Sequence, residues 1–286
     1  MKSGFATFVG RPNVGKSTLL NAILGEKVSI VAASPQTTRT EIRGVLNWRS
    51  GTQPARPDAQ VVFVDTPGIH KPKTTMGERL NATAEAASSG VDVVCLVIDA
   101  TAPLGKGDRF VASRLPKDAI CVVNKVDVAD RNQVLAQLTR AAALDLSEYF
   151  PISAKTGQGV DELVAAIVAR LPEGPQYYPE EMVSDLPDEV WVAELVREQL
   201  LAVVREELPH SIACRVTEYE WPRIRVEIVV ERDSQKGIVI GKGGLVLKQV
   251  GQAVRAQLRE GAYIELVVKV DPDWQRQPKS LDRLGY

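Results

Sequence analysis

Short apolar runs separated by longer mixed segments dominate the first part of the chain. They cover Phe5–Val9, Val61–Val64, Val93–Ile98 and Ile120–Val123, and runs of this length are typical of strands that are buried on both faces of a parallel sheet. Amphipathic stretches lie between and after them, such as Asp161–Leu171 with its apolar residues four apart. Strands that alternate with helices predict an α/β fold with a doubly wound, mostly parallel sheet.

The last third of the chain has a different pattern. An amphipathic stretch is followed by two alternating strand patterns, a glycine-rich turn between apolar stretches, and a last strand. These segments are Glu189–Glu206, Ser211–Tyr219, Arg223–Glu231, Gly241–Gly244, Val246–Leu258 and Tyr263–Val270. The segment before them is rich in proline and acidic residues, which is typical of an extended linker. We therefore expect a first domain at residues 1–172, a linker at 173–188 and a smaller α+β domain at 189–286.

Composition places the chain among ordinary globular proteins. Of 286 residues, 44% are hydrophobic and 25% are charged. The three cysteines show no metal or redox spacing, and no apolar window has a transmembrane length, so a cytoplasmic protein is expected. The formal net charge is −1, but residues 211–286 carry 13 Lys and Arg against 10 Asp and Glu. This excess of positive charge indicates an anionic partner for the second domain, although a solvated surface has the same composition.

A glycine-rich loop joins the first predicted strand to the first predicted helix. It reads Gly10-Arg11-Pro12-Asn13-Val14-Gly15-Lys16-Ser17-Thr18. Two glycines five positions apart, followed by Lys and Ser, match the phosphate-binding loop, in which backbone N–H groups and a helix N-terminus face phosphate oxygens. Lys16 can reach the β- and γ-phosphates, and the Ser17 hydroxyl can hold Mg²⁺. A plain glycine-rich turn is the alternative, and the flanking strand and helix favour the phosphate site.

A second candidate segment follows the apolar run that ends at Val64. It reads Asp65-Thr66-Pro67-Gly68-Ile69. A carboxylate at the end of a strand can bind the hydration shell of Mg²⁺ opposite a phosphate loop. Gly68 can offer its backbone N–H to the γ-phosphate because no side chain prevents a close approach. Considered alone, the four residues Asp65–Gly68 would also suit a β-turn.

Two further segments indicate a guanine site. They read Asn124-Lys125-Val126-Asp127 and Ser153-Ala154-Lys155. The Asp127 carboxylate can accept hydrogen bonds from guanine N1–H and the 2-amino group, which adenine lacks, so an adenine base would leave the carboxylate unpaired. Asn124 can meet guanine N7 and brace the loop, Lys125 can lie along the base, and the Ala154 N–H is placed to reach O6.

Together these motifs resemble the GTPase superfamily of P-loop proteins over residues 1 to about 172. The resemblance implies that a threonine of the first switch loop completes the Mg²⁺ shell; Thr38 is the matching residue, with Thr37 as the near alternative. It also implies that Lys16, Thr38 and Gly68 are the catalytic residues. Ile69 departs from the pattern, because many relatives carry a water-positioning glutamine there and an apolar side chain cannot orient water. We therefore expect slow intrinsic hydrolysis that a partner or a cation accelerates.

Three details of this resemblance leave alternatives open. An asparagine at the position of Asn13 helps to bind K⁺ in some similar GTPases, and bracing of the loop is an equal alternative. Arg11 and Arg39 are the candidates for an arginine finger. A solvated surface position is the better expectation for both arginines.

The second domain carries the turn Gly241-Lys242-Gly243-Gly244 between two predicted helices. Its element order resembles the type II KH domain, in which a Gly-x-x-Gly turn lets a sugar–phosphate backbone lie against main-chain amides. The resemblance implies that Lys242 attracts phosphate and that Val239 and Ile240 form an apolar floor for bases. Lys248, Arg255 and Arg259 follow at helical spacing and can line the nucleic-acid path, with a solvated helix face as the near alternative. A tight turn between two helices, without a ligand, is the alternative.

The combination of both domains resembles the bacterial Era family of GTPases over essentially the whole chain. This resemblance implies a monomer that binds GTP and GDP with Mg²⁺, binds the 3′ end of 16S rRNA and assists maturation of the small (30S) ribosomal subunit, with peripheral contact at the inner face of the cell membrane. Two alternatives are an RNA-binding assembly module with a structural nucleotide and a tRNA-modification GTPase. The KH element order argues against the latter.

Overall fold

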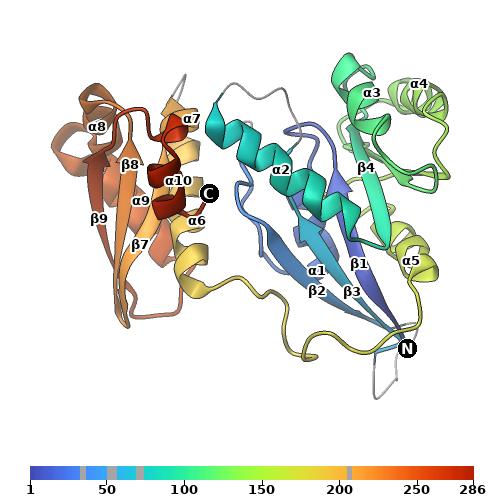
Figure 1. Ribbon diagram of the computed structural model, residues 1–286, viewed down its shortest axis with the longest axis horizontal. Helices are drawn as coiled ribbons and strands as arrows, with labels where there is room; N and C mark the ends of the chain where they lie inside the picture. Colours follow the sequence, from blue (N-terminus) through green and yellow to red (C-terminus); the bar gives the residue numbers. More distant parts are fainter. Residues whose placement is uncertain (33–36, 50–56, 69–73, 205–207) are drawn as a thin grey trace. The chain divides into compact units, whose positions relative to one another are not determined.

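The computed structural model describes residues 1–32, 37–49, 57–68, 74–204 and 208–286 (Figure 1). The chain divides into two compact units. The first comprises Met1–Ser29, Thr38–Lys71 and Leu80–Asp185, and the second comprises Ile30–Thr37, Pro72–Arg79 and Leu186–Tyr286. Two short segments from the first half of the sequence therefore belong to the second unit by their contacts, which the sequence pattern did not predict.

The first unit is built on a sheet in which one strand runs against the others. Its strands are β1 (Lys2–Val9), β2 (Ile42–Trp48), β3 (Ala59–Asp65), β4 (Val93–Asp99), β5 (Ile120–Asn124) and β6 (Glu148–Pro151), in the order β2-β3-β1-β4-β5-β6. β2 is antiparallel to β3, and the remaining neighbouring pairs are parallel. The expected mostly parallel sheet is confirmed, and the carboxyl ends of its parallel strands lie at one edge.

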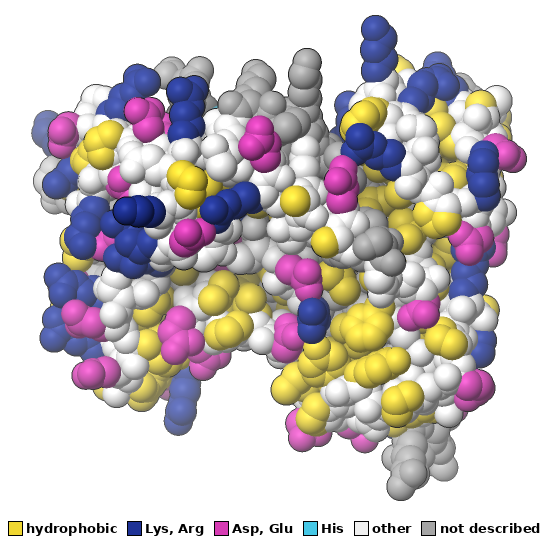
Figure 2. Space-filling view, in the orientation of Figure 1, with side chains coloured by type: hydrophobic (Ala, Val, Ile, Leu, Met, Phe, Trp, Pro, Cys, Tyr) yellow, Lys and Arg dark blue, Asp and Glu magenta, His cyan; other side chains and the backbone are white. Residues whose placement is uncertain are grey.

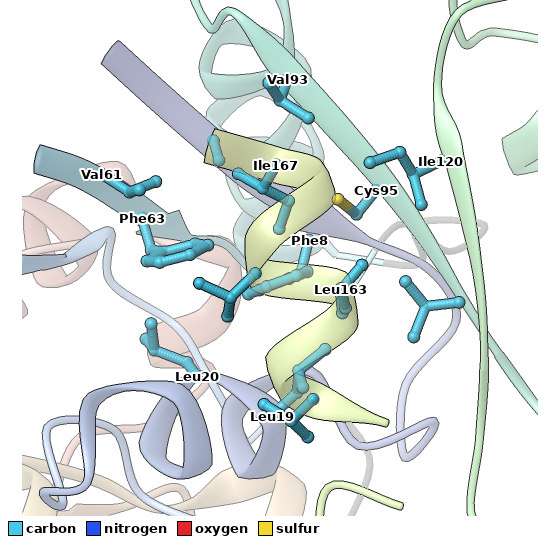
Figure 3. Close-up of a cluster of buried hydrophobic side chains, with 14 of the residues drawn as sticks. Phe8, Leu19, Leu20, Val61, Phe63, Val93, Cys95, Ile120, Leu163 and Ile167 are labelled. Carbon is cyan, nitrogen blue, oxygen red and sulfur yellow. The ribbon is translucent and has the colours of Figure 1, made fainter. Parts of the chain in front are cut away.

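Helices cover both faces of this sheet. One face packs against α1 (Lys16–Leu24) and α5 (Val160–Arg170), and the other packs against α2 (Thr75–Ser89), α3 (Lys106–Ala112) and α4 (Arg131–Ala142). On the first face the rings of Phe8 and Phe63 stack with centroids 5.3 Å apart, and Leu19 and Ile167 are completely buried beside them (Figure 3). Each such side chain stabilises the fold by about 1.5–3 kcal/mol. This core holds the strand ends, and the loops that follow them, in fixed positions.

The second unit contains a smaller, mixed sheet. Its strands are β7 (Ala213–Glu220), β8 (Arg223–Val230) and β9 (Tyr263–Val270), with β7 antiparallel and β9 parallel to the central β8. Its helices are α6 (Asp188–Val203), α7 (Leu208–Ser211), α8 (Asp233–Ile240), α9 (Leu245–Arg255) and α10 (Pro278–Leu284), with the short 3₁₀ segments Lys242–Gly244 and Trp274–Arg276. Alternate residues of β8 are completely buried against α6 and α9. The expected α+β order is confirmed.

The last residues of the chain pack within the second unit. Trp274 is completely buried, and its indole Nε1 donates a hydrogen bond to the Ser211 carbonyl oxygen at 3.0 Å. Its ring stacks on Tyr286 with centroids 5.9 Å apart. Among the described residues, no helix combines the length and the apolar character that crossing a membrane requires.

Candidate functional site

The loop between β1 and α1 is tightly enclosed by its neighbours. Gly10 has φ +154°, and a Cβ there would lie 2.4 Å from the Val97 carbonyl oxygen. Gly15 has φ +98°, and its Cβ would lie 2.3 Å from the Asn124 side-chain nitrogen. Since real Cβ atoms do not approach other atoms so closely, both positions require glycine. The β5 loop thus contacts the phosphate loop directly.

Lys16 is held inside this loop. Its side chain is almost buried, and its Nζ donates to the carbonyl oxygens of Gly10 and Arg11, both at 3.3 Å. Burial lowers the pKa of Lys16, while the nearby Asp65 carboxylate acts in the opposite direction. A Cβ on Gly68 would lie 3.3 Å from Lys16 Nζ, so the segment after β3 comes close to the ammonium group. A triphosphate in this loop would meet a cation that is already in place.

Hydroxyl and carboxylate oxygens gather beside Lys16. The hydroxyl oxygens of Ser17 and Thr38 lie 2.9 Å apart, and both lie within hydrogen-bond distance of Asp65 Oδ2, at 2.9 and 3.5 Å. Ser29 donates to the same oxygen at 2.8 Å. Asp65 is completely buried; burial raises its pKa, and the attraction of Lys16 opposes that rise. Within the described part of the chain, Asp65 Oδ1 has no hydrogen-bond partner.

These oxygens fit Mg²⁺. The ion prefers hard oxygen ligands in an octahedron with bonds of about 2.0–2.1 Å, and two adjacent ligands are then about 3 Å apart. The Ser17 and Thr38 hydroxyls have this separation, so these two side chains would hold the ion, and Asp65 would orient them. The hydroxyl of Thr37 donates to the Ala32 carbonyl oxygen at 3.3 Å instead. The structure therefore places Thr38, and not Thr37, at the candidate metal position.

The segment after β5 links three loops through one amide side chain. Asn124 Nδ2 donates to the Val14 carbonyl oxygen at 2.9 Å. Asn124 Oδ1 accepts from the backbone N–H groups of Lys125 at 2.8 Å and Ala154 at 2.9 Å. The bracing role predicted for Asn124 agrees with these contacts. The Ala154 N–H, predicted to face guanine O6, donates to Asn124 in this structure.

Lys125 and Asp127 follow β5 and bind different neighbours. Lys125 Nζ donates to the Asn13 carbonyl oxygen at 2.7 Å and forms an ion pair with Asp99 Oδ2 at 2.6 Å. Asp127 is exposed, and its Oδ1 accepts a hydrogen bond from the Ser153 hydroxyl at 2.8 Å. The aliphatic stem of Lys125 is thus fixed along the site, and Ser153 orients the carboxylate that would select guanine.

The remaining sequence candidates lie in the same loops, except Thr18, which lies in the first turn of α1. Thr18, Thr66, Pro67, Val126 and Lys155 follow the carboxyl ends of β1, β3, β5 and β6. Ile69 lies outside the described residues. Sequence reasoning missed Ser29 and Asp99, although the place of Asp99 at the end of a buried strand was a usable indication.

The two candidate arginine fingers have separate surroundings. Arg11 is partly exposed and forms an ion pair with the buried Asp108 at 2.7 Å. Arg39 is 3% exposed, so the expectation of a solvated surface position is wrong for it. The sequence missed Asp108, which also accepts from the Gly105 N–H at the start of α3 at 2.8 Å. An acidic residue three positions after the start of a helix was the only sequence indication for Asp108.

The glycine turn of the second unit is open. Gly241, Gly243 and Gly244 have φ of 72°, 61° and 77°, and Lys242 is exposed between them. Lys248 is exposed on α9, and Ile240 is partly buried beside the core. Figure 2 shows Lys and Arg side chains, interspersed with acidic ones, over the part of this unit that carries α8 and β9. Phosphate groups could therefore approach the turn.

One predicted RNA contact is corrected by burial. Val239 is completely buried in the core of the second unit, so its side chain cannot form a floor for bases. The helical turn of α8 points it inward and leaves Ile238 on the outer side. Ile238 and Leu245, each 57% exposed, are the apolar side chains that flank the turn at the surface. The sequence pattern located the turn but selected the wrong face of the helix.

Comparisons with known proteins agree with both units. A family model described as "50S ribosome-binding GTPase" matches residues 5–125, and one described as "KH domain" matches residues 207–275. GTPase Era of Mycobacterium avium (strain 104) is 44% identical over 303 residues, which cover 100% of this chain and 99% of the relative. GTPase Era of Mycobacterium tuberculosis (strain ATCC 25618 / H37Rv) is 44% identical over 304 residues, covering 99% and 98%.

Solved structures give the same result. A variant of Aquifex aeolicus Era bound to GDP.AlF4- is similar with a TM-score of 0.93 and 38% identity, covering 100% of this chain and 99% of that chain. Era in complex with MgGDPNP and nucleotides 1506-1542 of 16S ribosomal RNA has a TM-score of 0.93 and 39% identity, with the same coverage. Because relatives match over both units and nearly their whole length, the chain belongs to the Era family of GTPases.

Proposed function

We propose that this GTPase binds GTP with Mg²⁺, hydrolyses it to GDP and phosphate, and uses the bound nucleotide to control RNA binding by its second unit. The RNA is the 3′ end of 16S rRNA, and the process is maturation of the small ribosomal subunit. The observation that carries the proposal is the meeting of Thr38 with Ser17 and Asp65. Thr38 lies in the segment between α1 and β2, so a metal-bound triphosphate would fix that segment, and loss of the γ-phosphate would release it.

The chain's own groups explain most of the proposed chemistry. Main-chain amides of the Gly10–Ser17 loop and the ammonium of Lys16 would bind the phosphate oxygens and stabilise the negative charge that develops during transfer. The Gly68 N–H would add a further donor. Mg²⁺, when bound, would neutralise charge on the β- and γ-phosphates. Since Ile69 offers no hydrogen bond to a water molecule, we infer a slow intrinsic rate.

The guanine preference is proposed from Asp127 and Asn124. Ser153 holds the Asp127 carboxylate at 2.8 Å, and Asn124 ties the base loop to the phosphate loop. A guanine would use the donors that this carboxylate needs, whereas an adenine would not. Selection of the base and binding of the phosphate are thus carried out by loops that brace each other.

RNA binding is proposed for the Gly241–Gly244 turn. A turn almost without side chains lets a sugar–phosphate backbone approach main-chain amides, and Lys242 adds a positive charge. The relative crystallised with MgGDPNP and 16S rRNA nucleotides 1506-1542 supports this choice of RNA. Use of K⁺ at Asn13, a monomeric state, peripheral membrane contact and the domain boundaries at 172 and 189 stay predictions from the sequence.

The direct test is the affinity for RNA in two nucleotide states. A 16S rRNA 3′-end fragment is titrated with protein that is saturated with GDP or with a non-hydrolysable GTP analogue and Mg²⁺. We expect a difference of at least about tenfold, since couplings of this kind typically span 5- to 150-fold. Equal affinities would contradict nucleotide control. Turnover of GTP with K⁺ and RNA present separates an enzyme from an RNA-binding module with a structural nucleotide.

A further inference from the structure

Helix α6 contacts the backbone at Val31 and at Thr37, which both belong to the second unit. Glu198 Oε1 accepts a hydrogen bond from the Val31 backbone N–H at 3.0 Å. The guanidinium of Arg197, the residue before Glu198, donates to the carbonyl oxygen of Thr37. Two adjacent residues of α6 thus hold the backbone at Val31 and at Thr37.

Arg197 is an unusual residue for its position. Its side chain is completely buried, in a helix whose buried positions are otherwise apolar except for Glu194 and Glu198. Glu194, one turn earlier, forms a two-point ion pair with it, with Nε–Oε1 at 2.8 Å and Nη2–Oε2 at 2.5 Å. Burial opposes the charged form, but the attraction and hydrogen bonds of Glu194 outweigh it and raise the pKa of Arg197. The guanidinium is therefore a permanent, oriented donor.

A buried ion pair needs a reason other than stability, because apolar residues of the same volume often stabilise a core equally well. Here the reason lies in what the guanidinium binds. The guanidinium donates a hydrogen bond to the backbone carbonyl oxygen of Thr37, and an apolar side chain has no donor for that oxygen. The pair therefore specifies the conformation of one peptide unit.

That peptide unit leads directly to the candidate metal ligand. The carbonyl oxygen of Thr37 and the Cα of Thr38 lie in one plane, because the peptide bond that joins the two residues is planar. Fixing the oxygen therefore fixes the N–Cα bond of Thr38 and leaves only rotation about the φ and χ1 angles of Thr38 to set the position of its hydroxyl group. In this structure the carbonyl contact with Arg197 and the 2.9 Å separation of the Thr38 and Ser17 hydroxyls occur together.

We propose that Arg197, oriented by Glu194, is the positioning residue that presents Thr38 to the magnesium site and connects nucleotide state to helix α6 of the RNA-binding unit. This inference rests on the proposed function. Coupling free energies are reciprocal. A GTP-bound, metal-loaded site favours the Arg197 contact, and any RNA that stabilises the same arrangement of α6 raises the affinity for Mg²⁺ and GTP by the same factor.

A second contact of the same kind provides a matched control. Arg79, in the segment Pro72–Arg79 of the second unit, binds Asp282 and the carbonyl oxygen of Tyr286, both at 2.6 Å. The Asp282 side chain is 67% exposed, and exposed pairs of this kind contribute little. Arg79→Gln removes a contact between an early segment and the chain end without touching a candidate metal ligand.

The test uses three variants of the full-length chain. Glu194→Leu/Arg197→Met removes both buried charges together, so that neither is left unpaired. Arg197→Lys keeps a charge but loses the two-point geometry. We measure the affinities for GDP and for a non-hydrolysable GTP analogue at several Mg²⁺ concentrations. The double variant should bind the analogue about tenfold more weakly, as expected for loss of one hydrogen bond from a charged group, with GDP affinity changed less than twofold.

The pattern of these affinities separates positioning from general destabilisation. A structural defect would weaken both nucleotides, whereas a positioning defect weakens the analogue and shifts its Mg²⁺ requirement upward. Arg197→Lys should fall between wild type and the double variant, and Arg79→Gln should match wild type. A folded double variant with the wild-type ratio of affinities would overturn the inference. If the double variant does not fold, a wild-type ratio in Arg197→Lys overturns it instead.

RNA titrations distinguish this inference from the proposed function. Should the wild-type chain bind the RNA fragment equally in both nucleotide states, nucleotide control fails, while a selective loss of analogue binding in the variants still supports the positioning role. Should the wild-type chain show nucleotide control and the folded double variant retain it in full, the connection through Arg197 is wrong and the proposed function stands.

Discussion

The two glycine-rich loops of this GTPase require glycine for different reasons. In the phosphate loop, Cβ atoms at Gly10 and Gly15 would lie 2.4 and 2.3 Å from other atoms of the protein itself. In the turn of the second unit, a Cβ on Gly241 would lie 2.5 Å from Val246 Cγ2, but Gly243 and Gly244 have no atom within 4 Å of the Cβ position. The first loop is therefore packed by its own neighbours before any ligand arrives, whereas the second leaves space that a ligand can enter.

The lysines of the nucleotide site and of the glycine turn differ in the same way. Lys16 and Lys125 are held by carbonyl or carboxylate oxygens of neighbouring loops. Lys242 is exposed and, within the described ranges, has no ion-pair partner. A fixed cation suits one phosphate geometry, and preorganisation of this kind strengthens binding. A solvated cation attracts any nearby phosphate, and its contribution depends on salt.

The largest expected effect comes from filling the enclosed loop. Gly15→Ala would place a methyl group against the Asn124 amide and would also strain a residue with φ +98°. Because Asn124 braces both the phosphate loop and the base loop, its displacement should lower GTP affinity by about 1,000-fold or more, equivalent to about 4 kcal/mol. Nucleotide titration in the presence of Mg²⁺ measures this loss.

Gly25→Ala is the matched control for that substitution. Gly25 has φ +69° at the end of α1, but nothing lies within 4 Å of its Cβ position. It should therefore show only the backbone cost of a left-handed residue, about 1–2 kcal/mol in unfolding free energy, with normal GTP affinity. If both variants lose GTP binding to the same degree, steric enclosure is not what distinguishes the phosphate loop.

A smaller effect is expected at the base site. Asp127→Asn replaces an acceptor with a donor where guanine presents donors, so GTP affinity should fall about 100-fold, as expected from losing hydrogen bonds of about 1.5–3 kcal/mol to a charged group. Xanthosine triphosphate, which presents an oxygen at position 2, should bind better to the variant than GTP does. Competition between the two nucleotides provides the measurement.

Asp130→Asn provides the control for Asp127→Asn. Asp130 lies three residues later and caps α4 by accepting from the Gln133 N–H at 2.8 Å. Asparagine caps helices about as well as aspartate, so this variant removes a nearby charge and should keep the preference for GTP. An unchanged preference in Asp127→Asn would show that another group selects the base.

Local patterns in the sequence were sufficient for much of the nucleotide site. Each motif there combines a buried strand with a loop at its carboxyl end, and the order of parallel strands then brings the loops together. The apolar run Phe5–Val9 locates β1 to within a few residues of its observed bounds. Ser29 and Asp99 were missed because no local pattern marks a side chain whose partner lies in a distant loop.

The second unit shows the limits of such patterns more clearly. Alternation located β7 and β8, but periodicity could not decide which residue at the end of α8 faces inward, and Val239 was placed on the wrong side. Arg197 was not noticed, since a charged residue in an amphipathic helix is normally solvent-exposed. Its burial depends on Glu194 and on the Thr37 carbonyl, a contact between positions far apart in the sequence.

The open turn should respond only moderately to loss of its cation. Lys242→Gln should lower RNA affinity about fivefold and reduce the salt dependence of binding by about one counterion, because one phosphate contact is lost. Lys279→Gln, an exposed position on α10, removes the same charge outside the turn and serves as control. RNA titrations at several salt concentrations give both slopes. Identical slopes in the two variants would mean that Lys242 contributes only to the general charge of the unit.

The smallest effect concerns how firmly Lys125 is held. Burial alone would raise the pKa of Asp99, but hydrogen bonds from Lys125 Nζ at 2.6 Å and Thr101 outweigh it and lower the pKa below 3.8. Because the folded pKa is below the unfolded one, this stabilisation is complete above about pH 4 and decreases as the pH falls through the folded pKa. Asp99→Asn should therefore lower the free energy of unfolding by about 1 kcal/mol at pH 7. The difference from wild type should shrink when denaturant titrations are repeated toward pH 3. A difference that is independent of pH would assign the loss to packing rather than to the charge that fixes Lys125.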